Sequence, residues 1–116
     1  MYQIENEICR ISVKEHGSEL CEMYDKVRKR EYIWQAGPVW PKHGPLLFPA
    51  IGGFYGGTYM AGEKVYKMKA HGFARDMDFT PVYRTDEEIV MELQSSEETY
   101  ESYPYHFCLQ VSHRLE

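Results

Sequence analysis

Long hydrophobic runs and an excess of positive charge are both missing from this chain of 116 residues. No apolar run approaches the roughly 18 residues that a membrane-spanning helix needs, and residues 1–5 do not resemble the start of a signal peptide. The chain carries 13 Lys and Arg against 18 Asp and Glu, a formal charge of −5, which argues against a nucleic-acid-binding surface. We therefore expect an acidic cytoplasmic protein without membrane or nucleic-acid partners.

Cysteine is also scarce. Cys9, Cys21 and Cys108 make an odd count and contain no Cys-x-x-Cys pair. That pattern argues against a disulfide framework and against a zinc site. We expect reduced, buried, structural thiols and no metal ion.

The length suits a single domain, since typical domains have about 100–150 residues. Hydrophobic residues make up 43% of the chain and charged residues 27%, as in ordinary globular proteins. No internal repeat or linker divides the chain, so residues 1–116 are interpreted as one region. Positive charge is concentrated only at residues 26–30, which we interpret as a solvated turn.

Apolar and polar residues alternate at every second position, and helical periodicity is nearly absent. The pattern predicts strands at 20–24, 31–35, 64–68, 76–84, 89–93 and 105–112, besides the first at 9–13. Pro81 marks an edge or a bend, and a short helical turn follows Ser96 and ends before Pro104. Several short strands separated by turns predict an all-β fold, an antiparallel β-sandwich.

Residues 37–62 contain four prolines and seven glycines, which predicts a long ordered loop in place of strands. Loops of this length are commonly functional. A strand then leads to His-Gly-Phe-Ala-Arg-Asp at 71–76. His71 and Arg75 have groups that donate hydrogen bonds to hydroxyls or an anion, and Asp76 has a carboxylate to orient either. The alternative interpretation is a local ion pair between Arg75 and Asp76.

Three segments, Leu-Phe-Pro-Ala-Ile-Gly at 47–52, the 71–76 motif and Tyr-Pro-Tyr-His-Phe at 103–107, occur in this order. Together they resemble the aldose 1-epimerase (galactose mutarotase-like) family, in particular its bacterial branch of epimerase-like proteins. The resemblance extends over essentially the whole chain. It implies the N-terminal part of a large twisted β-sandwich that interconverts the α and β anomers of an aldose or hexose phosphate without a cofactor.

The resemblance also implies roles for the motif residues. His71 is expected to bind the sugar near its ring oxygen and Arg75 to bind hydroxyls or a phosphate, while Asp76 orients the site. Relatives commonly carry an arginine where this chain has Gly53. Their general-acid histidine and catalytic glutamate correspond to positions beyond residue 116, so we expect substrate-binding residues here but an incomplete set of catalytic groups.

Other interpretations stay open. His106 and His113 are the available substitutes for a catalytic histidine, although His106 alternates with the apolar face of the last predicted strand and His113 follows that strand near residue 116. The chain is alternatively a non-catalytic carbohydrate-binding module built from the aromatic loop with His71 and Arg75. It is alternatively a self-associating β-domain, since exposed sheet edges and apolar faces usually find partners, here a second copy of the chain.

Overall fold

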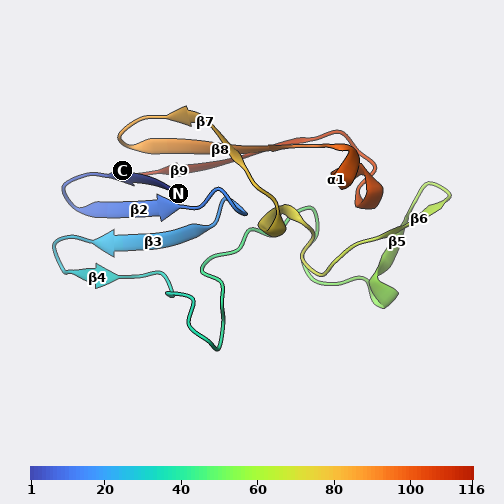
Figure 1. Cartoon of the computed structure of the whole chain (residues 1–116), viewed down its shortest axis with the longest axis horizontal. Helices are drawn as coiled ribbons and strands as arrows, with labels where there is room; N and C mark the ends of the chain where they lie inside the picture. The colour runs from blue at the N-terminus through green and yellow to red at the C-terminus, as the bar shows by residue number, and fades with distance from the viewer.

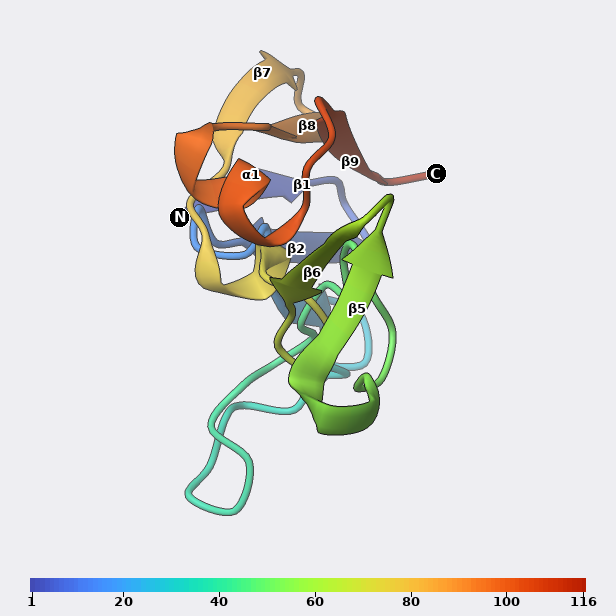
Figure 2. The ribbon, with the colours of Figure 1, turned by 90° about the vertical axis from the view of Figure 1, so that its right-hand side faces the viewer.

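The computed structural model describes residues 1–116, and two antiparallel sheets face each other within it (Figures 1 and 2). The first sheet has the order β1-β2-β3-β4, with bounds Tyr2–Glu5, Cys9–Val13, Leu20–Asp25 and Arg30–Glu31. The second has the order β7-β8-β9, with bounds Thr80–Arg84, Glu88–Gln94 and Cys108–Arg114. The predicted all-β, antiparallel fold class is confirmed.

The remaining elements connect the two sheets. Strands β5 (Thr58–Ala61) and β6 (Lys64–Lys67) form a separate hairpin, which projects from the rest of the molecule (Figure 1). Two single-turn 3-10 helices, η1 (Tyr55–Gly57) and η2 (Ala74–Asp76), precede β5 and β7, and the α-helix α1 (Glu97–Ser102) joins β8 to β9.

The core lies between the two sheets and follows from the alternation of apolar residues. On β8, every second side chain is buried and faces the apolar side chains of β1 and β2, and η2 and the segment after it close one end. The eight buried residues of this core are Ile4, Ile11, Val13, Ala74, Phe79, Ile89, Met91 and Leu93. The period of two that predicts the strands therefore also selects the core.

Two local predictions are confirmed. The basic residues 26–30 form the β3–β4 turn, where Asp25 accepts hydrogen bonds from the backbone N–H groups of Val27 (2.9 Å) and Arg28 (2.8 Å). Helix α1 begins with a capping box, because Ser96 Oγ accepts from Thr99 N and Thr99 Oγ1 accepts from Ser96 N. No helix is long and apolar enough to cross a membrane.

The predicted strand at 31–35 is wrong, because β4 ends at Glu31. The Glu31 carboxylate accepts hydrogen bonds from the backbone N–H of Met23 and from that of Ile33, both at 2.8 Å. A side chain thus takes the place of a strand partner, and the chain turns away from β3.

Three further boundaries differ from the prediction. Residues 58–61 belong to β5, because Gly62 adopts a φ of +63° and allows a tight turn into β6. The strand predicted from residue 76 begins only at Thr80, since Ala74–Asp76 coils into η2. The last strand begins at Cys108, after a turn in which Tyr105 N donates to Tyr103 O.

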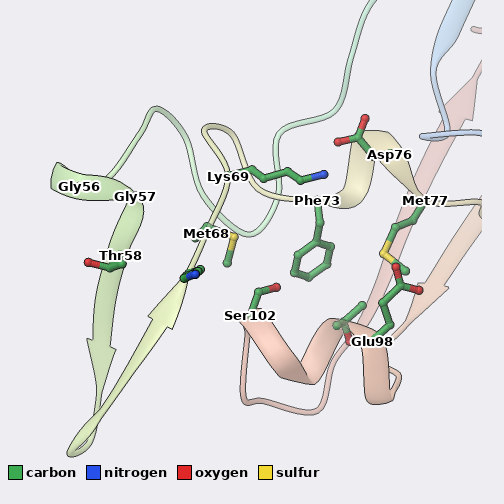
Figure 3. Close-up of a pocket in the computed structure, with 12 residues that line it drawn as sticks. Gly56, Gly57, Thr58, Met68, Lys69, Phe73, Asp76, Met77, Glu98 and Ser102 are labelled. Carbon is green, nitrogen blue, oxygen red and sulfur yellow. The ribbon is translucent and has the colours of Figure 1, made fainter.

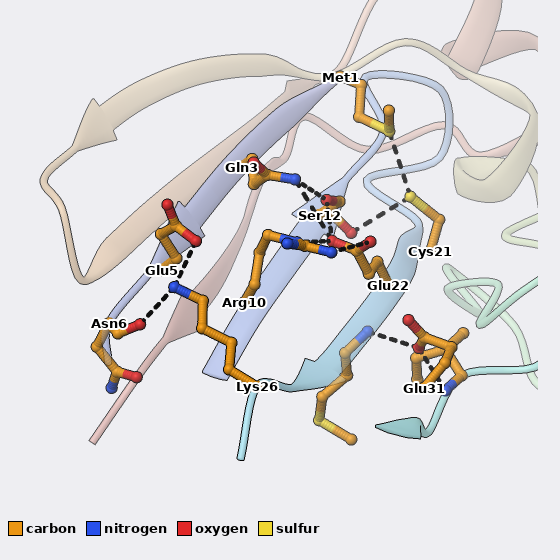
Figure 4. A network of polar contacts seen from close by, with 12 residues as sticks. Met1, Gln3, Glu5, Asn6, Arg10, Ser12, Cys21, Glu22, Lys26 and Glu31 are labelled. Carbon is orange, nitrogen blue, oxygen red and sulfur yellow. Dashed lines mark hydrogen bonds and ion pairs between the residues drawn. The ribbon is translucent and has the colours of Figure 1, made fainter. Parts of the chain in front are cut away.

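The outer face of the first sheet carries a continuous polar network (Figure 4). Arg10 pairs with Glu22 at 2.8 Å, and the same carboxylate accepts from Ser12 Oγ at 3.0 Å. Lys26 pairs with Glu5 at 2.6 Å. The hydrogen bond from Arg10 holds the pKa of Glu22 below its usual value. This face is therefore electrostatically satisfied by residues of the chain itself.

The overall shape is elongated. Its extents are 55 × 33 × 19 Å and its radius of gyration is 16.4 Å, whereas a compact domain of about 100 residues has about 13 Å. The β5–β6 hairpin contributes to this difference, because it has no buried residue.

Candidate functional site

The 47–52 and 71–76 motifs pack directly against each other, and we call this contact the motif junction. The carbonyl of Phe48 accepts hydrogen bonds from the backbone N–H groups of Phe73 (2.9 Å) and Ala74 (3.1 Å). Gly72 lies against the same carbonyl with a φ of +75°, and a Cβ at this position would be 2.1 Å from Phe48 O. Only glycine fits there, so the approach of the two segments requires the His-Gly sequence.

His71 is attached to the same junction by two hydrogen bonds with Gly52. Its backbone N–H donates to Gly52 O, and its Nδ1 accepts from Gly52 N, both at 2.9 Å. Because Nδ1 acts as an acceptor, the neutral imidazole carries its proton on Nε2. Nε2 makes no hydrogen bond within the chain, and the residue is half-buried. The ring thus offers an oriented N–H donor.

The third motif meets the first two through aromatic side chains. The ring centroid of Phe48 lies 6.2 Å from that of Phe73, 6.0 Å from that of Tyr103 and 5.1 Å from that of Phe107. Such edge and tilted contacts stabilise beyond the burial of area alone. The three segments that are separate in sequence therefore form one structural unit.

Arg75 is close to His71 in the same loop. Its guanidinium donates to Ala70 O at 3.2 Å, while its Nε is buried and has no partner. The backbone of Arg75 lies against Gly17, where a Cβ would be 2.8 Å from Arg75 O. The side chain is therefore fixed at one end and keeps unused hydrogen-bonding capacity.

Asp76 lies apart from the other two predicted residues. It is exposed, and its ion pair is with Lys42 at 3.9 Å, so the proposed local pair with Arg75 does not form. The structure places His71 and Arg75 on one loop, and it shows no contact from Asp76 to either.

Asp76 instead lines a cavity of about 480 Å³ between the β5–β6 hairpin, η2 and α1 (Figure 3). The ring of Phe73 points into this space, with Lys69 on one side and Ser102 and Glu98 on the other. Neither His71 nor Arg75 lines it. Sequence reasoning missed Lys69, Glu98 and Ser102 because they come from separate elements that no spacing pattern relates.

The hairpin reaches α1 through a tyrosine. Tyr59 Oη donates to Ser102 O at 2.6 Å, and the Tyr59 ring stacks on Phe54 with centroids 5.2 Å apart. Burial raises the pKa of the Tyr59 hydroxyl. This contact joins the hairpin to α1, two of the elements that border the cavity.

The long loop before the junction is fixed by a buried acid that sequence reasoning also missed. Glu19 is 4% exposed, and its carboxylate accepts from the backbone N–H of His43. The His43 ring nitrogen Nδ1 lies 3.3 Å from the same carboxylate and 3.2 Å from Lys14 Nζ. No sequence signal links a glutamate in the β2–β3 turn to a histidine in a distant loop.

The other residues singled out in the sequence are distributed as follows. His106 is exposed and lies 5.7 Å from the Tyr100 ring, whereas burial lowers the pKa of His113, whose Nε2 has no partner. The expectation of three buried thiols is confirmed only for Cys21, because Cys9 is half-buried and Cys108 is exposed on β9. No group of three or more His, Cys, Asp or Glu side chains is placed to hold a metal ion.

Gly53, the position at which the resemblance implies an arginine, lies next to the junction. A Cβ there would meet only the Cβ of Ala70, at 3.8 Å. The position therefore has room for a larger side chain beside the residue that precedes His71.

The protein is all-β, and two of its loops meet at a contact that requires glycine at position 72. The backbone of Gly52 orients the His71 ring at this contact. The chain belongs to the aldose 1-epimerase family, whose sequence model matches residues 1–116. A comparison with curated protein sequences gives no match.

Solved structures agree with this membership. The chain is 34% identical to a galactose mutarotase-like protein from Lactobacillus casei, with a TM-score of 0.96 over 100% of this chain and 40% of that one. It is 35% identical to a galactose mutarotase related enzyme from Lactobacillus acidophilus, with a TM-score of 0.96 over 99% and 39%. A Synechocystis protein at 24% identity shares the fold, with a TM-score of 0.85 over 99% and 44%. The chain thus spans about 40% of the length of the two Lactobacillus relatives.

Proposed function

We propose that this chain provides the sugar-binding part of an aldose 1-epimerase, which interconverts the α and β anomers of an aldose or a hexose phosphate. The observation that carries the proposal is the His71 ring, whose Nδ1 is occupied by Gly52 N–H at 2.9 Å. The Nε2–H group is thereby directed as a donor toward a sugar oxygen, the role that family membership suggests for this histidine.

The chemistry of anomer exchange explains why an oriented donor is useful. An acid donates a proton to the ring oxygen while a base removes the proton of the C1 hydroxyl, and the bond between C1 and the ring oxygen breaks. Rotation about C1–C2 and reclosure then give the other anomer. A donor near the ring oxygen stabilises the charge that develops there, and each general acid or base contributes about 10²–10⁴-fold.

Arg75 is proposed as the second ligand group. Its guanidinium uses one N–H group on Ala70 O and leaves others for hydroxyls or for the phosphate of a hexose phosphate. Asp76 is proposed to act from the neighbouring cavity, with Lys42 as its partner. The acid and base that transfer protons are proposed to come from outside residues 1–116. This chain would then bind the sugar without supplying the groups that catalyse the reaction.

The binding proposal is tested by NMR titration of the full chain with D-galactose, D-glucose and glucose 6-phosphate. We expect saturable shifts of the Gly52, His71 and Gly72 amides. The informative variant is His71→Asn, because Asn tolerates a positive φ such as the +66° observed here. Its side-chain oxygen still accepts from Gly52 N–H, while the Nε2–H donor is lost.

His106→Asn is the matched control, since it removes an exposed imidazole outside the junction. Loss of the shifts in His71→Asn and their retention in His106→Asn support the proposal. Shifts that are absent from the unmodified chain, or equal in both variants, contradict it.

Gly53→Arg sharpens the same experiment. It places a guanidinium next to Ala70, where the structure has space, and restores the residue that the resemblance implies at this position. We expect tighter sugar binding, about tenfold, as one charged hydrogen bond contributes about 1.5–3 kcal/mol before ordering costs. Gly53→Met, with a side chain of similar length but no charge, is the control and should leave affinity unchanged.

Polarimetry distinguishes a mutarotase component from a simple carbohydrate-binding module. We expect sugar binding without accelerated anomer exchange by the chain alone. Acceleration by the chain together with the part of the Lactobacillus casei relative outside the matched 40% supports the enzymatic proposal. Binding with no acceleration under either condition favours the carbohydrate-binding module.

A further inference from the structure

The β2–β3 turn, residues 14–19, packs against the segment that follows η2. Gly17 N donates to Met77 O at 2.7 Å, and Phe79 N donates to Glu15 O at 2.9 Å. The turn and this segment run antiparallel to each other between the two bonds. Together they form a short clamp that fixes the end of η2.

Gly17 is the point at which the turn meets Arg75. It is buried and has a φ of +72°, and a Cβ there would lie 2.8 Å from Arg75 O, 3.1 Å from Arg75 Cα and 3.2 Å from Arg75 C. All three are backbone atoms, so a side chain at position 17 fits only if η2 moves away. The close approach of η2 to the turn therefore requires glycine.

Arg75 connects the turn to the residue that precedes His71. Its backbone lies against Gly17, and its guanidinium donates to Ala70 O at 3.2 Å. That distance is at the upper end of the normal range for an N–H···O bond, so a small displacement of η2 breaks it. The Nε atom between these two ends is buried without a partner. The position of the guanidinium thus depends on where the Arg75 backbone is held.

The turn has anchors of its own, apart from η2. Ser18 and Glu19 are 3% and 4% exposed, and the Glu19 carboxylate accepts from the backbone N–H of His43. Leu20 forms an isolated bridge with Gly44. Because the turn is fixed to this loop as well, a side chain added at position 17 would displace η2 in preference to the turn.

We propose that Gly17 is a positioning residue for Arg75, because it admits η2 close to the β2–β3 turn and thereby holds the guanidinium at Ala70 O. A guanidinium fixed in this way offers its remaining N–H groups in one orientation, as paired recognition of a phosphate requires. The inference rests on the proposed function for its ligand, a hexose phosphate. The positioning itself is a property of the chain without ligand.

The first test is NMR of the ligand-free full chain, which follows the Arg75 Nε–H signal, assigned by its loss in Arg75→Gln. We expect Gly17→Ala to make this hydrogen exchange with water about tenfold faster, because the buried group gains access to solvent. Gly62→Ala is the matched control. Gly62 has a similar φ of +63°, but a Cβ there would meet nothing within 4 Å, so exchange at Arg75 should not change.

The second test is a double-mutant cycle, measured by calorimetric titration with glucose 6-phosphate. Gly17→Ala should weaken binding about tenfold, the effect of losing one hydrogen bond to a charged group. It should have no further effect in Arg75→Gln, because the group that it positions is already absent. If the unmodified chain does not bind glucose 6-phosphate, the proposed function fails, while the exchange measurement still decides the positioning of Arg75.

Asp78→Ala replaces Gly17→Ala in both tests if the latter does not fold. The Asp78 carboxylate is exposed and lies 2.9 Å from Nδ1 of His16 in the clamp, so its removal loosens the clamp without adding an atom to the interior. We expect a smaller change in the same direction, about twofold, as for the loss of an exposed pair.

Three results would overturn the proposal. The first is a folded variant of the clamp in which exchange at Arg75 Nε is unchanged. The second is an equal loss of affinity from the clamp variant with and without Arg75→Gln. The third is the same acceleration of exchange in Gly62→Ala, which would assign the effect to backbone strain and not to the contact with Arg75.

Discussion

Polar side chains are paired on the outer face of the first sheet. On the side that includes the motif junction and β9, two of them are not. On the outer face, Arg10 and Lys26 have carboxylate partners within 2.8 Å. On the other side lie Arg75 Nε and His113 Nε2, both buried without a partner. The polar groups of the outer face are satisfied within the chain, whereas these two nitrogens are buried without a hydrogen bond to another side chain.

The largest expected effect comes from Gly72→Ala at the motif junction. The added Cβ would be 2.1 Å from Phe48 O at a φ of +75°, so the two loops must separate. We expect a loss of about 3–5 kcal/mol in the free energy of unfolding, measured by urea denaturation. Gly53→Ala is the control, because its Cβ meets no atom closer than 3.8 Å. Equal stability of the two variants would show that the junction is not rigid.

Phe48→Ala tests the aromatic contacts that join the three motifs. Phe48 is half-buried, and its ring contacts Phe73, Tyr103 and Phe107. We expect a loss of about 2–3 kcal/mol, somewhat below the usual range for a fully buried phenylalanine. Phe54→Ala, at a position 40% exposed and stacked on Tyr59, should lose less than about 1 kcal/mol. A larger loss of unfolding free energy for Phe54→Ala than for Phe48→Ala would show that the hairpin contacts stabilise the fold more than the junction does.

Glu22→Gln tests the outer face of the first sheet. The pKa of Glu22 is lowered by the hydrogen bond from Arg10, so this carboxylate stabilises the folded state above its unfolded pKa of about 4.3. The contribution disappears as the pH falls through the lower folded pKa. We expect a loss of about 0.5–1 kcal/mol at pH 7, the usual value for a partly exposed pair.

Thermal or urea unfolding of Glu22→Gln at a series of pH values measures this dependence. The difference from the unmodified chain should shrink below pH 4. Glu7→Gln, which changes an exposed glutamate outside the network, is the control and should show no difference. A difference that is constant with pH would exclude the ionised pair as its cause.

The smallest expected effect concerns thiol reactivity. Cys21 is buried, and burial raises its pKa, whereas Cys108 is exposed on β9 with its pKa raised by the Glu92 hydrogen bond. Both pKa values are raised, so the difference in solvent exposure decides the reaction rates. We expect Cys108 to react faster than Cys21 with a maleimide, with little change in the stability of the protein. Mass spectrometry of partly labelled protein measures the order. Faster labelling of Cys21 would show that the first sheet opens more readily than β9.

Alternation in the sequence was sufficient for the fold class and for β2 and β8, because each buries one face against the core. It also located β3 and β6, although β6 has no buried residue. It failed at residues 31–35, where the Glu31 side chain replaces a strand partner, and at 58–61, where the glycine turn creates a hairpin without a fully buried residue. Both errors depend on contacts that a pattern of alternating residues does not contain.

The candidate site was predicted to a similar extent. The 71–76 motif located His71 and Arg75 on one loop, but it did not indicate that Gly72 lies against Phe48 O. The acceptor role of His71 Nδ1 depends on Gly52, 19 residues earlier, and the cavity beside Asp76 depends on α1. These pairings come from tertiary packing, so the residue types could be predicted but their partners could not.

The protected edge at β7 determines how far an assembly through the second sheet can extend. A sheet that gains a strand at β9 still ends at β7, where Pro81 and the register irregularity offer no continuous row of donors. Repeated addition, which leads to open-ended polymers, requires two free edges on each subunit. The second sheet therefore offers a regular edge on one side only, at β9, and cannot gain strands in both directions.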